Sequence, residues 1–150
     1  MDTMRKITIY TLFVANLLAI ILLWWSGSAT LFDGSADGTL IALGRLAGLL
    51  AMFFILVQLV LVSRIPIFEK AYGFDVLNRI HRKLGYILAG TIIFHPVLIV
   101  FGYAIARGVP LSEQVMSFIK DWEGGGKAVV GLGLILIAAF FALPRIRKWL

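Results

Sequence analysis

The stretch LIALGRLAGLLAMFFILVQLVLV, residues 40–62, decides the fold class of this chain. Only Arg45 near its start and Gln58 near its end interrupt a run of apolar and small residues. A helix needs about 20 predominantly apolar residues to cross the hydrocarbon core of a bilayer. The length of this run therefore predicts a transmembrane helix rather than the core helix of a soluble protein.

Three further apolar blocks extend over about residues 7–25, 84–104 and 126–143. The whole chain of 150 residues is 61% hydrophobic, whereas soluble domains are about 45–50% apolar. The last block reaches a spanning length only if the glycines before it join the helix or the bilayer thins locally. We therefore predict an all-α integral membrane bundle of four transmembrane helices, formed as a single domain over residues 1–150.

The first block has a second interpretation, as a secretory signal peptide. Arg5 and Lys6 precede it and small residues follow it. The apolar core of a signal peptide is shorter, however, at about 7–15 residues. Trp24 and Trp25 also close the block, as aromatic residues do at a membrane interface. We therefore favour an uncleaved first span.

The connections between the blocks are polar. Residues 26–38 are rich in Gly, Ser and Asp, and residues 63–83 form a basic connection with a short interfacial piece. In residues 104–127, apolar side chains at helical spacing predict a short helix on the membrane surface, namely Leu111, Val115, Phe118 and Ile119. Within the third block, Pro96 removes one backbone donor and predicts a kink near mid-membrane.

The basic residues predict the orientation of the bundle. Four spans place both termini on one side, and that side would hold ten of the fourteen Lys and Arg residues: Arg5, Lys6, Arg64, Lys70, Arg79, Arg82, Lys83, Arg145, Arg147 and Lys148. The other side would hold Arg45, Arg107, Lys120 and Lys127. Because basic loops stay cytoplasmic, we expect both termini in the cytoplasm. The net charge of +6 is then explained by topology and lipid contact, and no nucleic-acid partner is needed.

The two histidines of the chain, His81 and His95, both belong to the third span. Fourteen residues of helix rise about 21 Å and leave the two side chains about 40° apart on one face. That separation is too long for one metal ion but suits two stacked macrocycles, each taking one axial imidazole. The small residues Gly85, Ala89 and Gly90 would let a flat porphyrin approach the helix.

The two histidines differ in how strongly their positions indicate a function. His81 lies in a basic interfacial stretch, where its ring could simply meet lipid headgroups. His95 lies deep in the span, where ionisable groups are costly and usually functional.

The chain has no cysteine, so no thiolate or iron–sulfur site is possible.

The motif LNRIHRKLG at residues 77–85, followed by Phe94-His95-Pro96, resembles the third span of the ferric reductase–NADPH oxidase transmembrane family. GRLAG at residues 44–48 and RIP at residues 64–66 resemble the same family, over roughly residues 40–150. The resemblance implies a six-helix bundle with two b haems, held by histidine pairs on the third and fifth spans. Electrons would pass from cytoplasmic NAD(P)H through FAD to the inner haem, the outer haem and an external acceptor.

Carried over by position, the resemblance makes His81 a ligand of the inner haem iron and His95 a ligand of the outer one. It places Arg45 beside the outer haem, where its charge would neutralise a propionate or attract an anionic acceptor. Arg45 could also simply extend to the membrane interface, because it lies only five residues into its block. Arg79, Arg82 and Lys83 are near the inner haem position, but orientation in the membrane explains them as well, and we favour that explanation.

The chain departs from the family where the second histidine pair is expected, because no further histidine follows His95. It also has no Gly-rich nucleotide-binding fingerprint. We therefore expect the fifth and sixth helices, together with a flavin and nicotinamide reductase domain, from a longer polypeptide or a partner chain. The chain would then be the N-terminal part of the domain, not a complete catalyst alone, in the plasma (inner) membrane as a multi-pass protein.

Two other functions remain open. The chain could be a small integral membrane subunit or scaffold without cofactor, with incidental histidines. It could instead form a proton or ion path through His95, Gln58 and Asn16. We rank the ion path last, because the spans contain no carboxylate, the usual partner in such a relay.

Overall fold

The computed structural model describes residues 2–142, and within that range it contains helices and turns but no strand. The elements in chain order are α1 (Asp2–Ser28), the 3₁₀ turn η1 (Ala29–Leu31), α2 (Ala36–Val62), α3 (Pro66–Tyr72), α4 (Phe74–Arg107), α5 (Leu111–Lys120) and α6 (Gly125–Ala142). The all-α prediction is thereby confirmed. The predicted last span ends at residue 143, which lies outside the described residues.

Three helical segments are long and apolar enough to cross a membrane, namely residues 3–31, α2 and α4. The helices α5 and α6 meet at an angle of 101° and pass the same test only together. A fourth crossing therefore exists only if this bent pair is counted as one broken span. The break contains Gly124, whose φ of 81° lies in the left-handed region that glycine adopts without strain. The predicted short helix before the last block is therefore present as α5, and it turns sharply into α6.

The expected connection at residues 63–83 is mostly helical, which corrects the sequence-based boundary. Pro66 starts α3 at its first turn, the position where its missing N–H costs nothing. Gly73, with a φ of 77°, forms the corner between α3 and α4. Because α4 begins at Phe74, His81 lies inside a regular helix rather than in a loop. The same helix continues without interruption through Pro96.

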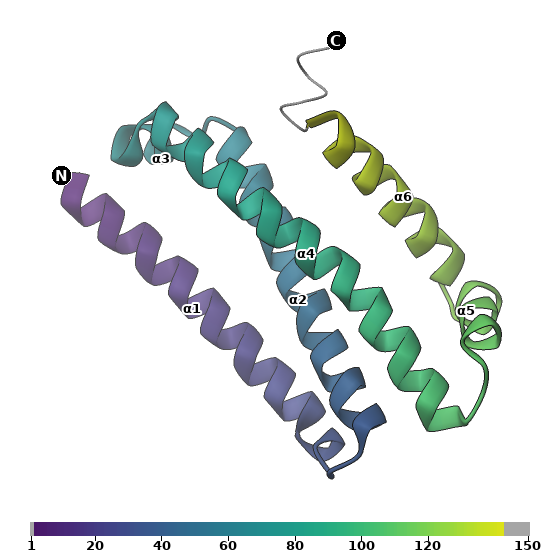
Figure 1. Ribbon diagram of the computed structural model, residues 1–150. Helices are drawn as coiled ribbons and strands as arrows, with labels where there is room; N and C mark the ends of the chain where they lie inside the picture. The colour runs from purple at the N-terminus through teal and green to yellow at the C-terminus, as the bar shows by residue number, and fades with distance from the viewer. Residues whose placement is uncertain (1, 143–150) are drawn as a thin grey trace.

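The bundle is centred on the antiparallel pair α2 and α4, which lie side by side (Figure 1). Two glycines allow the backbones to approach closely. A Cβ on Gly44 would lie 2.9 Å from Cδ1 of Ile99, and one on Gly102 would lie 2.7 Å from Cγ1 of Ile41. Both distances are shorter than real carbon contacts, so a side chain at either position would force the facing isoleucine or the helices to shift. Ile41 and Ile99 are buried between the helices.

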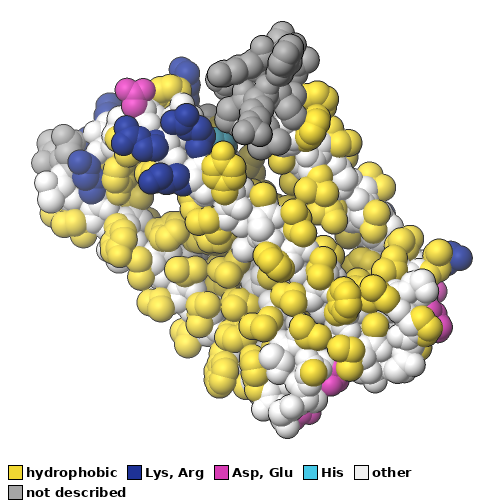
Figure 2. Space-filling view, in the orientation of Figure 1, with side chains coloured by type: hydrophobic (Ala, Val, Ile, Leu, Met, Phe, Trp, Pro, Cys, Tyr) yellow, Lys and Arg dark blue, Asp and Glu magenta, His cyan; other side chains and the backbone are white. Residues whose placement is uncertain are grey.

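The bundle has two chemically different ends. The start of α1, the α3 corner and the end of α6 lie at one end, whereas η1 and α5 lie at the other (Figure 1). Lys and Arg side chains gather at the α3 end, and most of the visible Asp and Glu side chains lie near the opposite end (Figure 2). Hydrophobic side chains cover the surface between them (Figure 2). This pattern suits a multi-pass membrane protein, whose apolar middle faces lipid.

Candidate functional site

His95, in the middle of α4, is held by the backbone of α2. Its Nδ1 lies 2.8 Å from the carbonyl oxygen of Gly44. A carbonyl only accepts hydrogen bonds, so Nδ1 must carry the proton. The Nε2 of the neutral ring therefore keeps its lone pair, the form in which histidine binds a metal.

Gly48, one helical turn after Gly44, provides the space that the His95 ring occupies. A Cβ on Gly48 would lie 2.7 Å from Nδ1 and 2.8 Å from Cε1 of His95. Any side chain there would displace the imidazole from the Gly44 carbonyl. In the sequence these two glycines are notable only as part of the GRLAG resemblance. Their small-xxx-small spacing was the signal for a close helix contact in a membrane.

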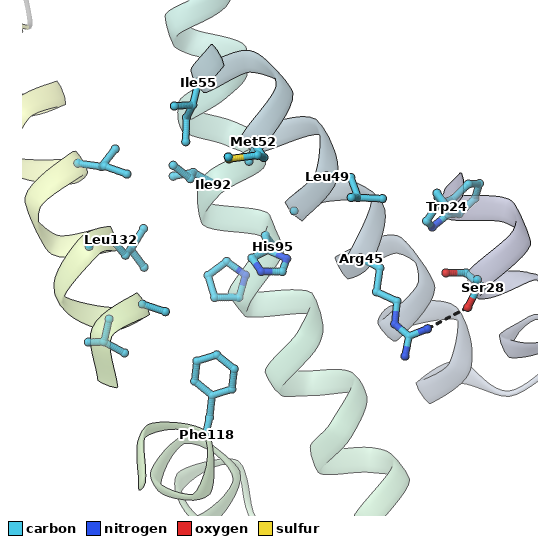
Figure 3. A pocket seen from close by; sticks show the side chains of 18 of the residues that line it. Trp24, Ser28, Arg45, Leu49, Met52, Ile55, Ile92, His95, Phe118 and Leu132 are labelled. Atoms are coloured by element: carbon cyan, nitrogen blue, oxygen red, sulfur yellow. Dashed lines mark hydrogen bonds between the residues drawn. The ribbon is translucent and has the colours of Figure 1, made fainter. Parts of the chain in front are cut away.

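The His95 ring lines a cavity of about 870 Å³ between α1, α2, α4, α5 and α6. Figure 3 shows the labelled side chains around it, with Leu132 and Phe118 across from His95 and with Met52 and Ile92 further along the bundle. The lining is largely aliphatic and aromatic. Cofactor sites are commonly apolar cavities of about 300–1,000 Å³ with a few placed polar groups.

Arg45 lies at the edge of the same cavity. Its guanidinium donates to the carbonyl oxygen of Gly27 at 3.0 Å, and the side chain is exposed (Figure 3). Ser28, which is buried, lies beside this contact. The structure thus brings together two of the three predicted cofactor-binding residues, Arg45 and His95.

His81, the third predicted residue, is not part of this cavity lining. Its ring is half-buried, and its Nδ1 is buried without a hydrogen-bond partner in the described structure. Its backbone carbonyl accepts a hydrogen bond of 3.0 Å from Nε2 of Gln58 on α2. About four helical turns separate His81 from His95, a rise of about 21 Å. Any group bound at His81 would therefore be separate from a group bound at His95.

The small residues expected to face a porphyrin lie elsewhere. None of Gly85, Ala89 and Gly90 belongs to the lining of the cavity. A Cβ on Gly85 would meet Nε2 of Gln58 at 3.2 Å, and one on Gly90 would meet nothing within 4 Å. The glycine that makes room for an imidazole is Gly48, on the other helix.

The polar groups of the alternative ion path are not connected through Asn16. Its side-chain amide donates to the carbonyl of Leu12, one turn back in its own helix, and it is exposed. No other hydrogen bond of this amide is formed within the described residues. Asn16 therefore gives the ion path no link to His95 or to Gln58.

The donor set suits a haem better than a bare metal ion. Residues 2–142 contain no group of three or more His, Cys, Asp or Glu side chains that could hold an ion. A porphyrin supplies four nitrogen ligands itself and needs only axial ligands from the protein. His95 offers a fixed ring with a free Nε2 in an apolar cavity, with a cation at the edge. His81 offers a half-buried residue whose Nδ1 is buried and unpartnered.

Comparison with known proteins identifies the family of the chain. Residues 47–150, more than half of the chain, match the family described as ferric reductase like transmembrane component. No curated protein and no solved structure matches the chain. The matched range begins one residue before Gly48 and includes both histidines. On this evidence, the chain belongs to the ferric reductase like transmembrane component family.

Proposed function

We propose that this chain carries electrons across a membrane through b-type haem, as the N-terminal part of a six-helix domain. The observation that carries the proposal is the state of His95. Its Nδ1–H is fixed on the Gly44 carbonyl, so Nε2 presents a lone pair beside an apolar cavity. Metal-binding histidines typically have this second interaction, which sets the tautomer and the ring orientation.

In the proposed topology α1, α2 and α4 are three spans, and α6 makes the fourth crossing as the spanning part of the bent pair α5–α6. Both termini are then cytoplasmic in the plasma (inner) membrane. The basic asymmetry along the sequence supports this orientation, as does the cluster of Lys and Arg side chains at the α3 end (Figure 2). His81 then lies toward the cytoplasmic face, and His95 and Arg45 lie toward the outer face. The two histidines would serve the inner and the outer haem respectively.

A bound haem would supply a one-electron carrier, because its iron alternates between the ferric and ferrous states. The chain itself does the remaining work at the outer position. Nε2 of His95 would hold the haem iron, and the Gly44 carbonyl would raise its basicity. The apolar lining around Met52, Ile92 and Leu132 would exclude water. Arg45 would balance a propionate charge or attract an anionic acceptor.

The second axial ligands, the fifth and sixth helices and the reductase that uses NAD(P)H and FAD would come from other parts of the assembly. The flavin of that reductase would convert hydride chemistry into one-electron transfer. This chain would supply one imidazole for each haem, and the added helices would supply the other. We therefore expect weak haem binding by this chain alone and stable binding in the complex.

An optical spectrum tests the proposal. Membranes containing the chain together with its fifth and sixth helices should show a dithionite-reduced b-type spectrum with two haems per complex. His95→Phe should remove one haem, whereas the control Asn16→Leu, far from any proposed ligand, should keep both. A featureless visible spectrum from a folded wild-type complex would favour a subunit without cofactor instead.

A further inference from the structure

Helix α2 contacts both histidines of α4, at positions that correspond in register. Gly44 meets His95 through its carbonyl, and Gln58 meets His81 through its side chain. Gln58 follows Gly44 by 14 positions, and His81 precedes His95 by 14 positions. Because α2 and α4 are antiparallel, the two pairs occupy equivalent places four helical turns apart. Each histidine residue therefore has a hydrogen-bond partner on α2: Gly44 for the ring of His95 and Gln58 for the main-chain carbonyl of His81.

The amide orientation of Gln58 is settled by its partner. The His81 carbonyl can only accept, so the nitrogen of the Gln58 amide must face it, at 3.0 Å. Oε1 is then the free end of the amide. It is buried and unpartnered, and so is Nδ1 of His81. No other buried side-chain nitrogen or oxygen atom in the described part of the chain lacks a partner.

These two orphaned atoms are chemically complementary. An amide oxygen only accepts, and an imidazole Nδ1 donates when it carries the proton. Buried polar groups are nearly always paired, and the Gln58 side chain is already anchored on the main-chain carbonyl of His81. Neither orphaned atom has a partner in the structure, so the two side chains must rotate to form a bond with one another. If Nε2 of His81 binds iron, Nδ1 must carry the proton, and Oε1 of Gln58 is the buried acceptor in the described residues that still lacks a donor.

We propose that Gln58 is the positioning residue of His81, whose Nδ1–H donates to Oε1 of Gln58. Gln58 thereby sets the tautomer that leaves Nε2 of His81 free for a metal, as the Gly44 carbonyl does for His95. The role of this tautomer in haem binding rests on the proposed function, but the hydrogen bond itself does not. Gln58 acts through His81 and touches no cofactor.

The glycines around the two contacts support the same conclusion. Gly48 of α2 leaves room for the His95 ring, and a Cβ on Gly85 of α4 would lie only 3.2 Å from the Gln58 amide. Gly48 lies one turn after Gly44 on α2, and Gly85 lies one turn after His81 on α4. The fold thus keeps space for an imidazole at one position and for a carboxamide at the other.

The rival explanation is that Gln58 only ties α2 to α4 through the His81 carbonyl. Two variants separate the explanations. Gln58→Met has a similar length but no acceptor oxygen, whereas Gln58→Glu keeps an acceptor oxygen. Both variants lose the Nε2 donor to the His81 carbonyl, so only the acceptor distinguishes them. Asn16→Leu removes a side-chain amide from another span without touching a histidine and serves as the control.

The readout is the ¹⁵N spectrum of the imidazole nitrogens in the haem-free chain in detergent, with the rings neutral. The chain has only two histidines, so the two rings can be resolved. We expect His81 of the wild type, of Gln58→Glu and of Asn16→Leu to carry its proton on Nδ1. In Gln58→Met, His81 should become a mixture of tautomers while His95 stays unchanged. Wild-type His81 shifts in Gln58→Met would overturn the inference.

A second measurement needs no variant. In the wild-type chain, the His81 Nδ1 proton should show a nuclear Overhauser contact with the Gln58 amide protons. A bare Nδ1 in the folded wild type would overturn the inference even if Gln58→Met failed to fold. In the haem-loaded complex, Gln58→Met should weaken binding of the inner haem about 10- to 100-fold and spare the outer haem. Loss of both haems, or of neither, would contradict a role in positioning His81.

Because the tautomer is measured without haem, its outcome is independent of the proposed function. An Nδ1 proton that depends on Gln58 in a protein that never binds haem would refute the electron-transfer proposal alone. A haem-binding complex whose His81 tautomer ignores Gln58 would refute the positioning role alone.

Discussion

The imidazole Nδ1 of His95 and the backbone carbonyl of Gly44 form a 2.8 Å hydrogen bond across the α2–α4 interface. The bond fixes both the rotation and the tautomer of the ring. It requires close helices, which Gly44 and Gly102 permit. The packing of the bundle and the chemistry of His95 therefore depend on the same few small residues.

Gly48→Ala should damage the His95 site while leaving the protein in the membrane. Its Cβ would lie 2.7 Å from Nδ1 of His95, so the ring must leave the Gly44 carbonyl. We expect a stability loss of about 1–3 kcal/mol from overpacking and loss of the outer haem. Haem content per folded complex measures the effect. Gly90→Ala is the matched control, because its Cβ meets nothing within 4 Å, and it should retain both haems.

Replacing the two histidines separately should give different defects in the complete complex. His95→Phe should remove the outer haem and stop delivery to the external acceptor. His81→Phe should block reduction of either haem by the flavin, because in the proposed function electrons would enter at the inner position. The separation of about 21 Å keeps the two effects distinct. Haem stoichiometry and flavin-driven reduction measure them, and two haems retained in both variants would refute the ligand assignment.

Arg45→Gln should affect the cavity edge in two ways. It removes the hydrogen bond to the Gly27 carbonyl, a loss of about 1 kcal/mol for a typical net hydrogen bond. It also removes the positive charge proposed to attract propionates or an anionic acceptor. We expect weaker outer-haem retention or a higher KM for an anionic acceptor. Arg107→Gln, which removes an arginine from outside this cavity lining, is the control. Unchanged retention and KM would indicate that Arg45 only reaches the interface.

Pro96→Ala should preserve membrane insertion, because α4 is continuous through this position. Pro96 lines the cavity next to His95, and its ring removes a backbone donor from the helix. Alanine restores that donor, so we expect a change in the ring angle of His95 and in the absorption of the outer haem. An identical spectrum and midpoint potential in a haem-loaded sample would contradict this role for Pro96.

Reporter fusions check the topology. A reporter fused after Leu150 should be cytoplasmic, and one inserted in the turn between α5 and α6 should lie outside. The asymmetry of basic residues predicts both results. The 101° bend makes the second fusion informative, because α5 and α6 could otherwise form a re-entrant loop. A non-cytoplasmic Leu150 or a cleaved first segment would refute four spans.

The sequence by itself determined that α2 and α4 are apolar helices of spanning length and that both histidines lie on one of them. Residues 40–62 form a helix that crosses because almost every side chain there prefers hydrocarbon to water, and this preference belongs to each residue whatever its neighbours. His81 and His95 share a face because helical geometry is regular. The same local logic predicted a short helix at α5.

Only the tertiary structure decided which groups of different helices contact one another. The proton on Nδ1 of His95 depends on the Gly44 carbonyl, 51 positions earlier, and the contact of Gln58 with His81 spans 23 positions. The cavity joins side chains from α1 to α6. Such contacts depend on which helix faces meet and how closely, because packing acts between residues far apart in the chain, whereas hydropathy acts on each segment alone.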